Sequence, residues 1–114
     1  MPPKLSGTYA YDGNNNIIQI DDALGNIENV TLSEEAEQLA NNYVEEEVVR
    51  VKHMADAQHI AIATVERVDV LVSWNFRHIV NLGRIHAFNS VNLRLGYPIL
   101  EIRIPKEILD EKEI

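Results

Sequence analysis

The amino-acid sequence predicts an α/β fold with three layers, α/β/α, around a mainly parallel β-sheet. From residue 27 onward, short β-prone runs alternate with segments of helical periodicity, which is the pattern of such a fold. The run Val70–Val72 is uniformly apolar, as strands buried on both faces are. The chain has 114 residues, of which 46% are hydrophobic and 25% charged. That size and composition fit one globular domain with a single core.

Residues 1–26 predict a β-hairpin that precedes the alternating part. Two β-prone runs, Thr8–Tyr11 and Ile17–Ile20, flank the turn-rich cluster Asp12–Asn16. Residues 21–26 follow as a loop. The chain therefore divides into an N-terminal hairpin or extension, 1–26, and a second part, 27–114.

The first half of this second part predicts one strand and two helices. Ile27–Leu32 is a short strand candidate, and Ser33 is suited to cap the helix that continues to about Val48. The apolar spacing of Met54–Arg67 predicts a second helix, with one apolar face turned to the core.

The second half predicts two more strands and three helical segments. Gly96-Tyr97-Pro98 should end a helix, and Gly83 should separate two of them. The expected elements are the strand Val70–Val72, helices Phe76–Leu82 and Ile85–Leu95, the strand Ile99–Ile104, and a final turn from Pro105 to Leu109.

The composition and net charge of the chain limit the classes of function that it can have. The net charge of −8, from 18 acidic and 10 basic residues, argues against a broad basic surface for nucleic acid. The acidic runs predict solvated helix faces. Without cysteine the chain has no disulfide and no thiolate zinc site, which fits the cytoplasm. We expect no secretory signal, no membrane span and no nucleotide cofactor, because the corresponding apolar runs and glycine motifs do not occur.

Candidate site residues follow the buried strand Val70–Val72. Ligands of parallel α/β sheets bind beyond the carboxyl ends of the strands, and Ser73, Trp74 and Asn75 occupy that position. The alternative is structural: Asn75 caps the next helix and Trp74 packs on it. Asp56, in the first turn of the helix before this strand, either points toward Asn75 or only stabilises the helix N-terminus.

The four histidines do not predict a zinc site. His53, His59, His78 and His86 include no pair at i and i+4 and no HExxH motif. We expect His59 and His78 to form hydrogen bonds at helix edges.

The block DAQHIAIATVERVDVLVSWNFRHIVNLGRIHAFNSVNLRLGYPILEIRIPKEIL, which begins at Asp56, resembles the C-terminal part of PIN-domain proteins of the VapC-like toxin type. The resemblance covers about residues 27–108 and implies a truncated PIN-like domain preceded by the hairpin. It further implies a metal-dependent endoribonuclease architecture, in which carboxylates hold Mg²⁺ or Mn²⁺. Asp56 matches an acidic family position and Asn75 a position where many members carry Asp. Trp74, His59 and His78 match the pattern without an assigned role, as does Ser73.

The N-terminal part departs from the family. PIN domains begin with a strand that carries an Asp, followed by two helices that supply a Glu, and residues 1–26 do not resemble that unit. Asp12, Asp21 and Asp22 are the acids within this segment. An uncovered sheet edge should result, to be covered by a partner protein, a second copy or the hairpin itself.

These observations lead to three hypotheses. The first is a catalytically inactive PIN-derived module that keeps the fold and binds a protein partner, or a second copy, through the uncovered sheet edge. The second is an active Mg²⁺- or Mn²⁺-dependent endoribonuclease that completes its acidic site from another subunit or from the N-terminal segment, with RNA as its ligand. The third is a truncated reading frame without a selected function.

Overall fold

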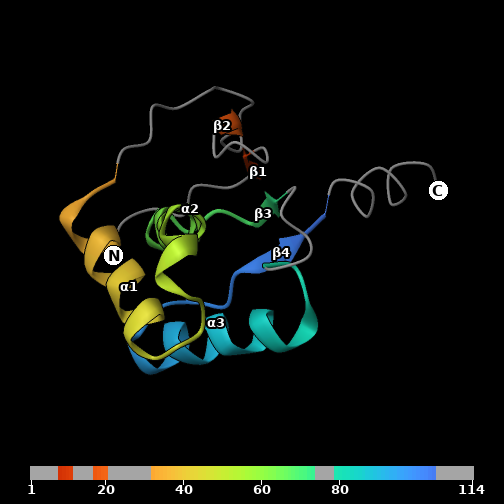
Figure 1. Ribbon diagram of the computed structural model, residues 1–114. Coiled ribbons are helices and arrows are strands. Elements are labelled where there is room, and N and C mark those ends of the chain that lie inside the picture. The colour runs from red at the N-terminus through yellow and green to blue at the C-terminus, as the bar shows by residue number, and fades with distance from the viewer. Residues whose placement is uncertain (1–7, 12–16, 21–31, 74–78, 105–114) are drawn as a thin grey trace.

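A four-stranded sheet and three α-helices make up the part of the chain that the structure describes (Figure 1). This computed structural model describes residues 8–11, 17–20, 32–73 and 79–104. The elements, in chain order, are β1 (Thr8–Tyr11), β2 (Ile17–Ile20), α1 (Glu34–Glu45), the 3-10 turn η1 (Val51–His53), α2 (Met54–Val65), β3 (Val70–Ser73), α3 (Leu82–Arg94) and β4 (Glu101–Arg103).

The sheet has the strand order β2-β1-β3-β4. β1 and β2 form the antiparallel hairpin, whereas β1, β3 and β4 run parallel to one another. The predicted α/β fold, with a mainly parallel sheet and an N-terminal β-hairpin, is confirmed.

The hairpin belongs to the same sheet as the rest of the chain. β1 pairs with β3 along its whole length, from Thr8 beside Val70 to Tyr11 beside Ser73. Of the three coverings expected for this edge of β3, the hairpin is therefore the one observed.

Both faces of the central strands are buried. Tyr9 and Tyr11 point to one face of β1 and Ala10 to the other, and all three are at most 5% exposed. The same holds for Leu71, Val72 and Ser73 in β3. The expectation that Val70–Val72 is a doubly buried strand is confirmed for its last two residues.

Helices α1 and α2 follow from capping and apolar spacing. Ser33 caps α1, because its side-chain oxygen accepts a hydrogen bond from the Ala36 N–H at 3.1 Å. The exposed face of α1 carries the acidic runs Glu34, Glu35 and Glu37 and, toward and beyond its end, Glu45–Glu47. The opposite face of α1 packs on α2. Helix α2 has buried residues around most of its circumference. The shared core includes Leu39, Tyr43, Ile60, Leu71 and Phe88.

One continuous helix replaces the predicted break at Gly83. Helix α3 begins at Leu82 and contains Gly83 in its first turn, because Asn81 caps it by accepting a hydrogen bond from the Arg84 N–H at 2.9 Å. Residues 79–81 are not helical, so the prediction of a helix that reaches Leu82 from Phe76 is wrong for these positions. Residues 76–78 lie outside the described residues.

Other predicted elements are shorter or lie outside the description. Strand β4 covers Glu101–Arg103 of the predicted Ile99–Ile104. Leu32 has no regular structure, and residues 27–31 of the predicted strand, like the expected turn from Pro105, lie outside the described residues.

All three α-helices end in the same motif. After α3, the N–H groups of Gly96 and Tyr97 donate to the carbonyls of Leu93 and Asn92, which is the Schellman pattern. Gly96 has the positive φ of 90° that this pattern requires. Glu47 (φ 61°) and Arg67 (φ 60°) occupy the corresponding position after α1 and α2. A positive φ is energetically unfavourable for residues that, unlike glycine, have a Cβ atom.

No helix in the described ranges is long and apolar enough to cross a membrane.

Candidate functional site

The candidate site lies where β1 and β3 end beside the first turn of α2. Tyr11 and Ser73 are neighbours across these two parallel strands, so their side chains point to the same face of the sheet. Asp56 and His59 project from α2 onto that face, where they meet the tyrosines of β1. A buried polar cluster results at the carboxyl ends of the strands, the position at which parallel sheets bind ligands.

Asp56 is the carboxylate of this cluster. It is 5% exposed, and its Oδ1 accepts a hydrogen bond from the Tyr11 hydroxyl at 2.7 Å. Its Oδ2 lies 3.6 Å from Nδ1 of His53, which ends the 3-10 turn before α2. A buried carboxylate needs hydrogen-bond donors, and the Tyr11 hydroxyl supplies one to Asp56.

His59 links the two tyrosines. Its Nδ1 lies 2.6 Å from the Tyr9 hydroxyl, and which of the two atoms donates depends on the imidazole tautomer. Its ring stacks on Tyr11 with centroids 4.1 Å apart and planes 15° from parallel. Tyr9 approaches the same ring edge-on. The expected hydrogen bond of His59 at a helix edge is confirmed.

Burial favours the neutral form of the Tyr9 and Tyr11 hydroxyl groups. Burial raises the pKa of Tyr9 far above its usual value. The pKa of Tyr11 is raised chiefly by burial and further by the charge of Asp56, while a hydrogen bond with Ser73 lowers it in part. At neutral pH Tyr11 therefore donates a hydrogen bond to Asp56. Ser73 belongs to the same cluster through its hydrogen bond with Tyr11.

The described residues do not fit Mg²⁺ or Mn²⁺ by themselves. Around Asp56 they offer two phenols, two imidazoles and one hydroxyl, whereas hard divalent cations prefer several anionic oxygens. No group of three or more His, Cys, Asp or Glu side chains suited to a metal occurs within residues 8–11, 17–20, 32–73 and 79–104.

Three predicted site residues are brought together and three are not described. Asp56, His59 and Ser73 share the cluster, whereas Trp74, Asn75 and His78 lie outside the described residues. Sequence reasoning missed Tyr9 and Tyr11. The signal was the alternation Tyr-Ala-Tyr, which in a strand turns two hydroxyls to the same face.

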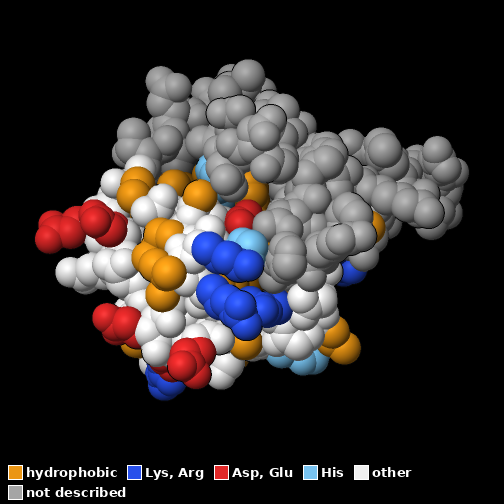
Figure 2. Space-filling view, in the orientation of Figure 1, with side chains coloured by type: hydrophobic (Ala, Val, Ile, Leu, Met, Phe, Trp, Pro, Cys, Tyr) orange, Lys and Arg blue, Asp and Glu red, His pale blue; other side chains and the backbone are white. Residues whose placement is uncertain are grey.

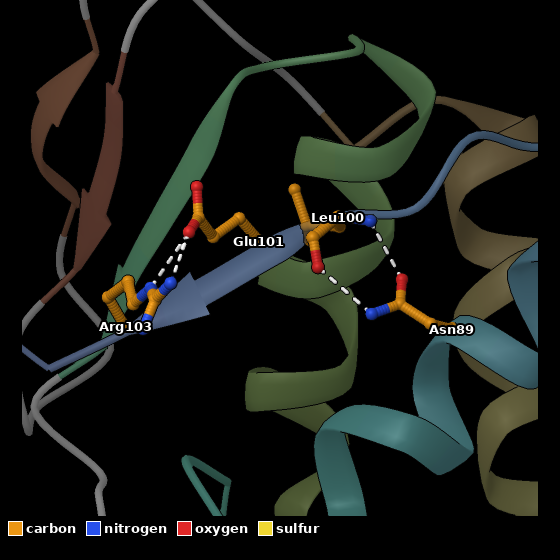
Figure 3. A network of polar contacts seen from close by, with 4 residues as sticks. All are labelled: Asn89, Leu100, Glu101 and Arg103. Carbon is orange, nitrogen blue, oxygen red and sulfur yellow. Dashed lines mark hydrogen bonds and ion pairs between the residues drawn. The ribbon is translucent and has the colours of Figure 1, made fainter. Parts of the chain in front are cut away.

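A second polar network holds α3 against its neighbours. Asn92, fully buried, accepts a hydrogen bond from the Tyr43 hydroxyl and donates to Thr64 Oγ1 at 3.4 Å. Its neighbour Asn89 forms two hydrogen bonds with the backbone of Leu100, just before β4 (Figure 3). On the outer side of β4, Glu101 and Arg103 pair with each other (Figure 3).

Two surface hollows flank these networks. One, of about 410 Å³, is lined by Arg50 and Arg84 together with Glu47, on the face where Figure 2 shows Lys and Arg side chains gathered. Arg84 is fixed there by donating to the Val48 carbonyl at 2.7 Å. The other, of about 770 Å³, lies between α3 and the segment 99–103 and is mostly apolar.

Comparison of the chain with protein-family models, with curated proteins and with solved structures gave no match.

Proposed function

We propose that this chain is a catalytically inactive PIN-like domain, related to VapC-type endoribonucleases, that acts as a protein-interaction module. The resemblance from Asp56 onward supports the relationship. The hydrogen bond from Tyr11 to Asp56 carries the proposal of inactivity, because it uses the carboxylate that matches the family's metal-binding acid.

The physical reason lies in what a cation would have to displace. The Tyr11 hydroxyl already uses one lone pair of Asp56 Oδ1, so a metal ion that took that position would break this buried hydrogen bond. A hydrogen bond to a charged group is worth about 1.5–3 kcal/mol, so its loss would weaken metal binding at that position by a factor of roughly 10 to 150. Asp56 offers little charge to offset that loss, because the described residues form no group of three or more side chains suited to a metal.

An active Mg²⁺- or Mn²⁺-dependent endoribonuclease is the alternative. One observation favours it: β1 lies directly beside β3, so the N-terminal segment enters the sheet next to the strand that precedes Asn75. That segment and the loop after it supply Asp12, Asp21 and Asp22 in the sequence. In this alternative such acids, or those of a second subunit, would join Asp56, and RNA would be the substrate.

A metal titration separates the two proposals. For the inactive module we expect no rise in melting temperature on addition of millimolar Mn²⁺ and no cleavage of RNA, because a ligand stabilises only a protein that binds it when folded. A rise in melting temperature together with RNA cleavage that Asp56→Asn abolishes would establish the nuclease instead.

The remaining expectations belong to the same proposal. We propose a protein partner, or a second copy of the chain, as the binding partner of the module. We propose the cytoplasm as its location, on the ground that a chain without cysteine fits a reducing compartment.

A further inference from the structure

The smaller of the two hollows gathers positive charge. Its volume is about 410 Å³, and Arg50 and Arg84 line it. Lys52 is exposed and follows Val51, which also lines the hollow. Figure 2 shows Lys and Arg side chains gathered on this face. We call this surface, formed by Arg50, Arg84 and the adjacent Lys52, the basic hollow.

The cations of the basic hollow lack carboxylate partners. Within the described part of the chain, Arg50, Lys52 and Arg84 form no ion pair, whereas Arg94 and Arg103 each pair with a glutamate. Like charges that gather without counter-charges raise the local positive potential, and a bound anion lowers it. The local charge of this surface therefore favours an anionic ligand, although the whole chain is acidic.

One acid lies in the described lining of the basic hollow. Glu47 is exposed, and no ion pair joins it to Arg50 or Arg84. It occupies the fixed turn that ends α1, where its φ is 61°. Glu47 therefore does not neutralise the two arginines through an ion pair, and they remain open to an anion from outside the chain.

Arg84 is held in position before any ligand binds. It is half-buried, and its Nη1 donates a hydrogen bond to the Val48 carbonyl at 2.7 Å. A guanidinium group has five N–H donors in a planar fork that matches the two oxygens of a carboxylate, so other donors remain for a ligand. Because part of the side chain is already ordered, binding loses less conformational entropy.

The remaining walls of the basic hollow are aliphatic. Val44, Val49 and Val51 line it, and Val51 is 71% exposed. No aromatic side chain occurs in the described lining. Single-stranded RNA is typically bound by stacking of its bases on aromatic side chains along an extended basic groove. Aliphatic walls around a few cations fit a peptide better, with an acidic side chain beside an aliphatic one.

We propose that the basic hollow binds an acidic segment of a partner protein, with an Asp or Glu carboxylate between Arg50 and Arg84 and an aliphatic side chain against Val51. The inference rests on the proposed function, because it names the surface and the partner of the interaction module. It also replaces the edge of β3 as the expected contact, since the hairpin strand β1 covers that edge.

The local charges also bear on a second copy as the occupant. A two-fold dimer through this surface would place one basic hollow against another and bring like charges together. A copy could instead present the exposed acidic residues of α1, Glu34, Glu35 and Glu37. That contact joins two unlike surfaces head to tail, and such contacts form rings or open filaments.

Two matched peptides test the proposal. The probe is a fluorescently labelled peptide of about ten residues in which Glu alternates with Val, and the control has Gln in place of every Glu. The full chain should bind the Glu peptide at least about tenfold more tightly than the Gln peptide, because charge-assisted hydrogen bonds are stronger than neutral ones. Added salt should weaken the binding of the Glu peptide. Equal binding of the two peptides, or no binding at millimolar peptide, would overturn the proposal.

Matched variants of the protein locate the site. Arg50→Gln should weaken binding of the Glu peptide by about threefold to tenfold. Glu47→Gln should strengthen it by about twofold, because a repelling charge is removed. Arg103→Gln, on the outer side of β4, changes the net charge as much as Arg50→Gln does and should leave binding unchanged. Circular dichroism should show that all three variants stay folded. Equal effects of Arg50→Gln and Arg103→Gln would show that the peptide does not bind in the basic hollow.

RNA and a second copy are tested as rival occupants. A labelled single-stranded RNA of about ten nucleotides should bind more weakly than the Glu peptide, and tighter binding that Arg50→Gln abolishes would assign the hollow to nucleic acid. Sedimentation should show a monomer, and larger assemblies that Arg50→Gln dissociates would assign it to a second copy. Either result overturns the inference without deciding inactivity, which the Mn²⁺ titration and the RNA cleavage assay decide separately.

Discussion

The side-chain amide of Asn89 forms hydrogen bonds with both backbone groups of Leu100. Its Nδ2 donates to the Leu100 carbonyl at 3.0 Å, and its Oδ1 accepts from the Leu100 N–H at 2.7 Å. The amide therefore replaces a neighbouring strand for a residue that lies just outside β4. This pairing joins the middle of α3 to the sheet.

Asn89→Ala should be strongly destabilising. It leaves both backbone groups of Leu100 without these partners, and each unsatisfied buried group costs about 1–3 kcal/mol. We expect urea unfolding to show a loss of about 2–4 kcal/mol. The exposed neighbour Ser90 provides the control, since Ser90→Ala should change stability by no more than about 0.5 kcal/mol. Similar losses in the two variants would mean that the amide has no such role.

Tyr11 and Asp56 should be energetically coupled. Tyr11→Phe removes the hydroxyl that donates to the buried carboxylate, so we expect a loss of about 1–3 kcal/mol. A double-mutant cycle with Asp56→Asn measures the coupling, which should reach at least about 0.5 kcal/mol for residues in direct contact. Simple additivity of the two single changes would show that the hydrogen bond contributes nothing.

Three buried tyrosines should make the protein sensitive to alkali. Burial raises the pKa of Tyr9, Tyr11 and Tyr43 in the folded state. Unfolded phenols ionise near pH 10, so above about that pH the unfolded state gives up protons that the folded state keeps. The stability is fully present below about pH 10 and falls above it, by about 1.4 kcal/mol per pH unit for each tyrosine.

Absorbance near 295 nm reports this ionisation directly. In the native protein these three of the four tyrosines should remain un-ionised until the chain unfolds, and then ionise together. A smooth titration of all four near pH 10, with the fold intact by circular dichroism, would contradict the prediction.

Glu47→Gly should stabilise the protein. Glu47 adopts a φ of 61° at the end of α1, a conformation that costs a residue with a Cβ about 1 kcal/mol and glycine almost nothing. Thermal unfolding should show a gain of about 0.5–1 kcal/mol. The exposed residue Gln38, within α1, provides a control with the opposite sign. Gln38→Gly should lower the free energy of unfolding by about 0.5–1 kcal/mol, because glycine has a low helix propensity.

The two glycines of the α3 region should respond to alanine with opposite signs. Gly96 has a φ of 90°, so Gly96→Ala should lose about 1 kcal/mol, although a Cβ there meets no other atom within 4 Å. Gly83 lies in the helix, and a Cβ there meets only Asn81 Oδ1 at 3.7 Å, an ordinary contact. Gly83→Ala should therefore gain about 0.4–1 kcal/mol, as thermal unfolding can show.

Local patterns predicted most of the described elements. Ser33 as a cap, the apolar spacing of α1 and α2, and the apolar run of β3 are short-range signals, and the structure confirms each. The helix break predicted at Gly83 was wrong, because glycine lowers helix stability little in the first turn of a helix. The cap at Asn81, and not the spacing of apolar residues, determines where α3 begins.

The candidate site was only partly predictable because its contacts are long-range. Ser73 was predicted from its position at the end of a strand and Asp56 from the first turn of the helix before that strand, whereas His59 was expected only to form a hydrogen bond at a helix edge. Tyr9 and Tyr11 stand about 50 residues earlier, and nothing local indicates that β1 pairs with β3. The buried link from Tyr43 to Asn92 was missed for the same reason.

The pairing of β1 with β3 also bears on the order in which the chain assembles. Thr8–Tyr11 is synthesised before α1 and α2, whereas its parallel partner Val70–Ser73 is synthesised after them. Closing a loop of that length lowers the conformational entropy of the chain before the new contacts stabilise it, so strand pairing of this kind is slow. The hairpin should therefore join the sheet late, and amide hydrogens of β1 should gain protection from exchange after those of α1 and α2.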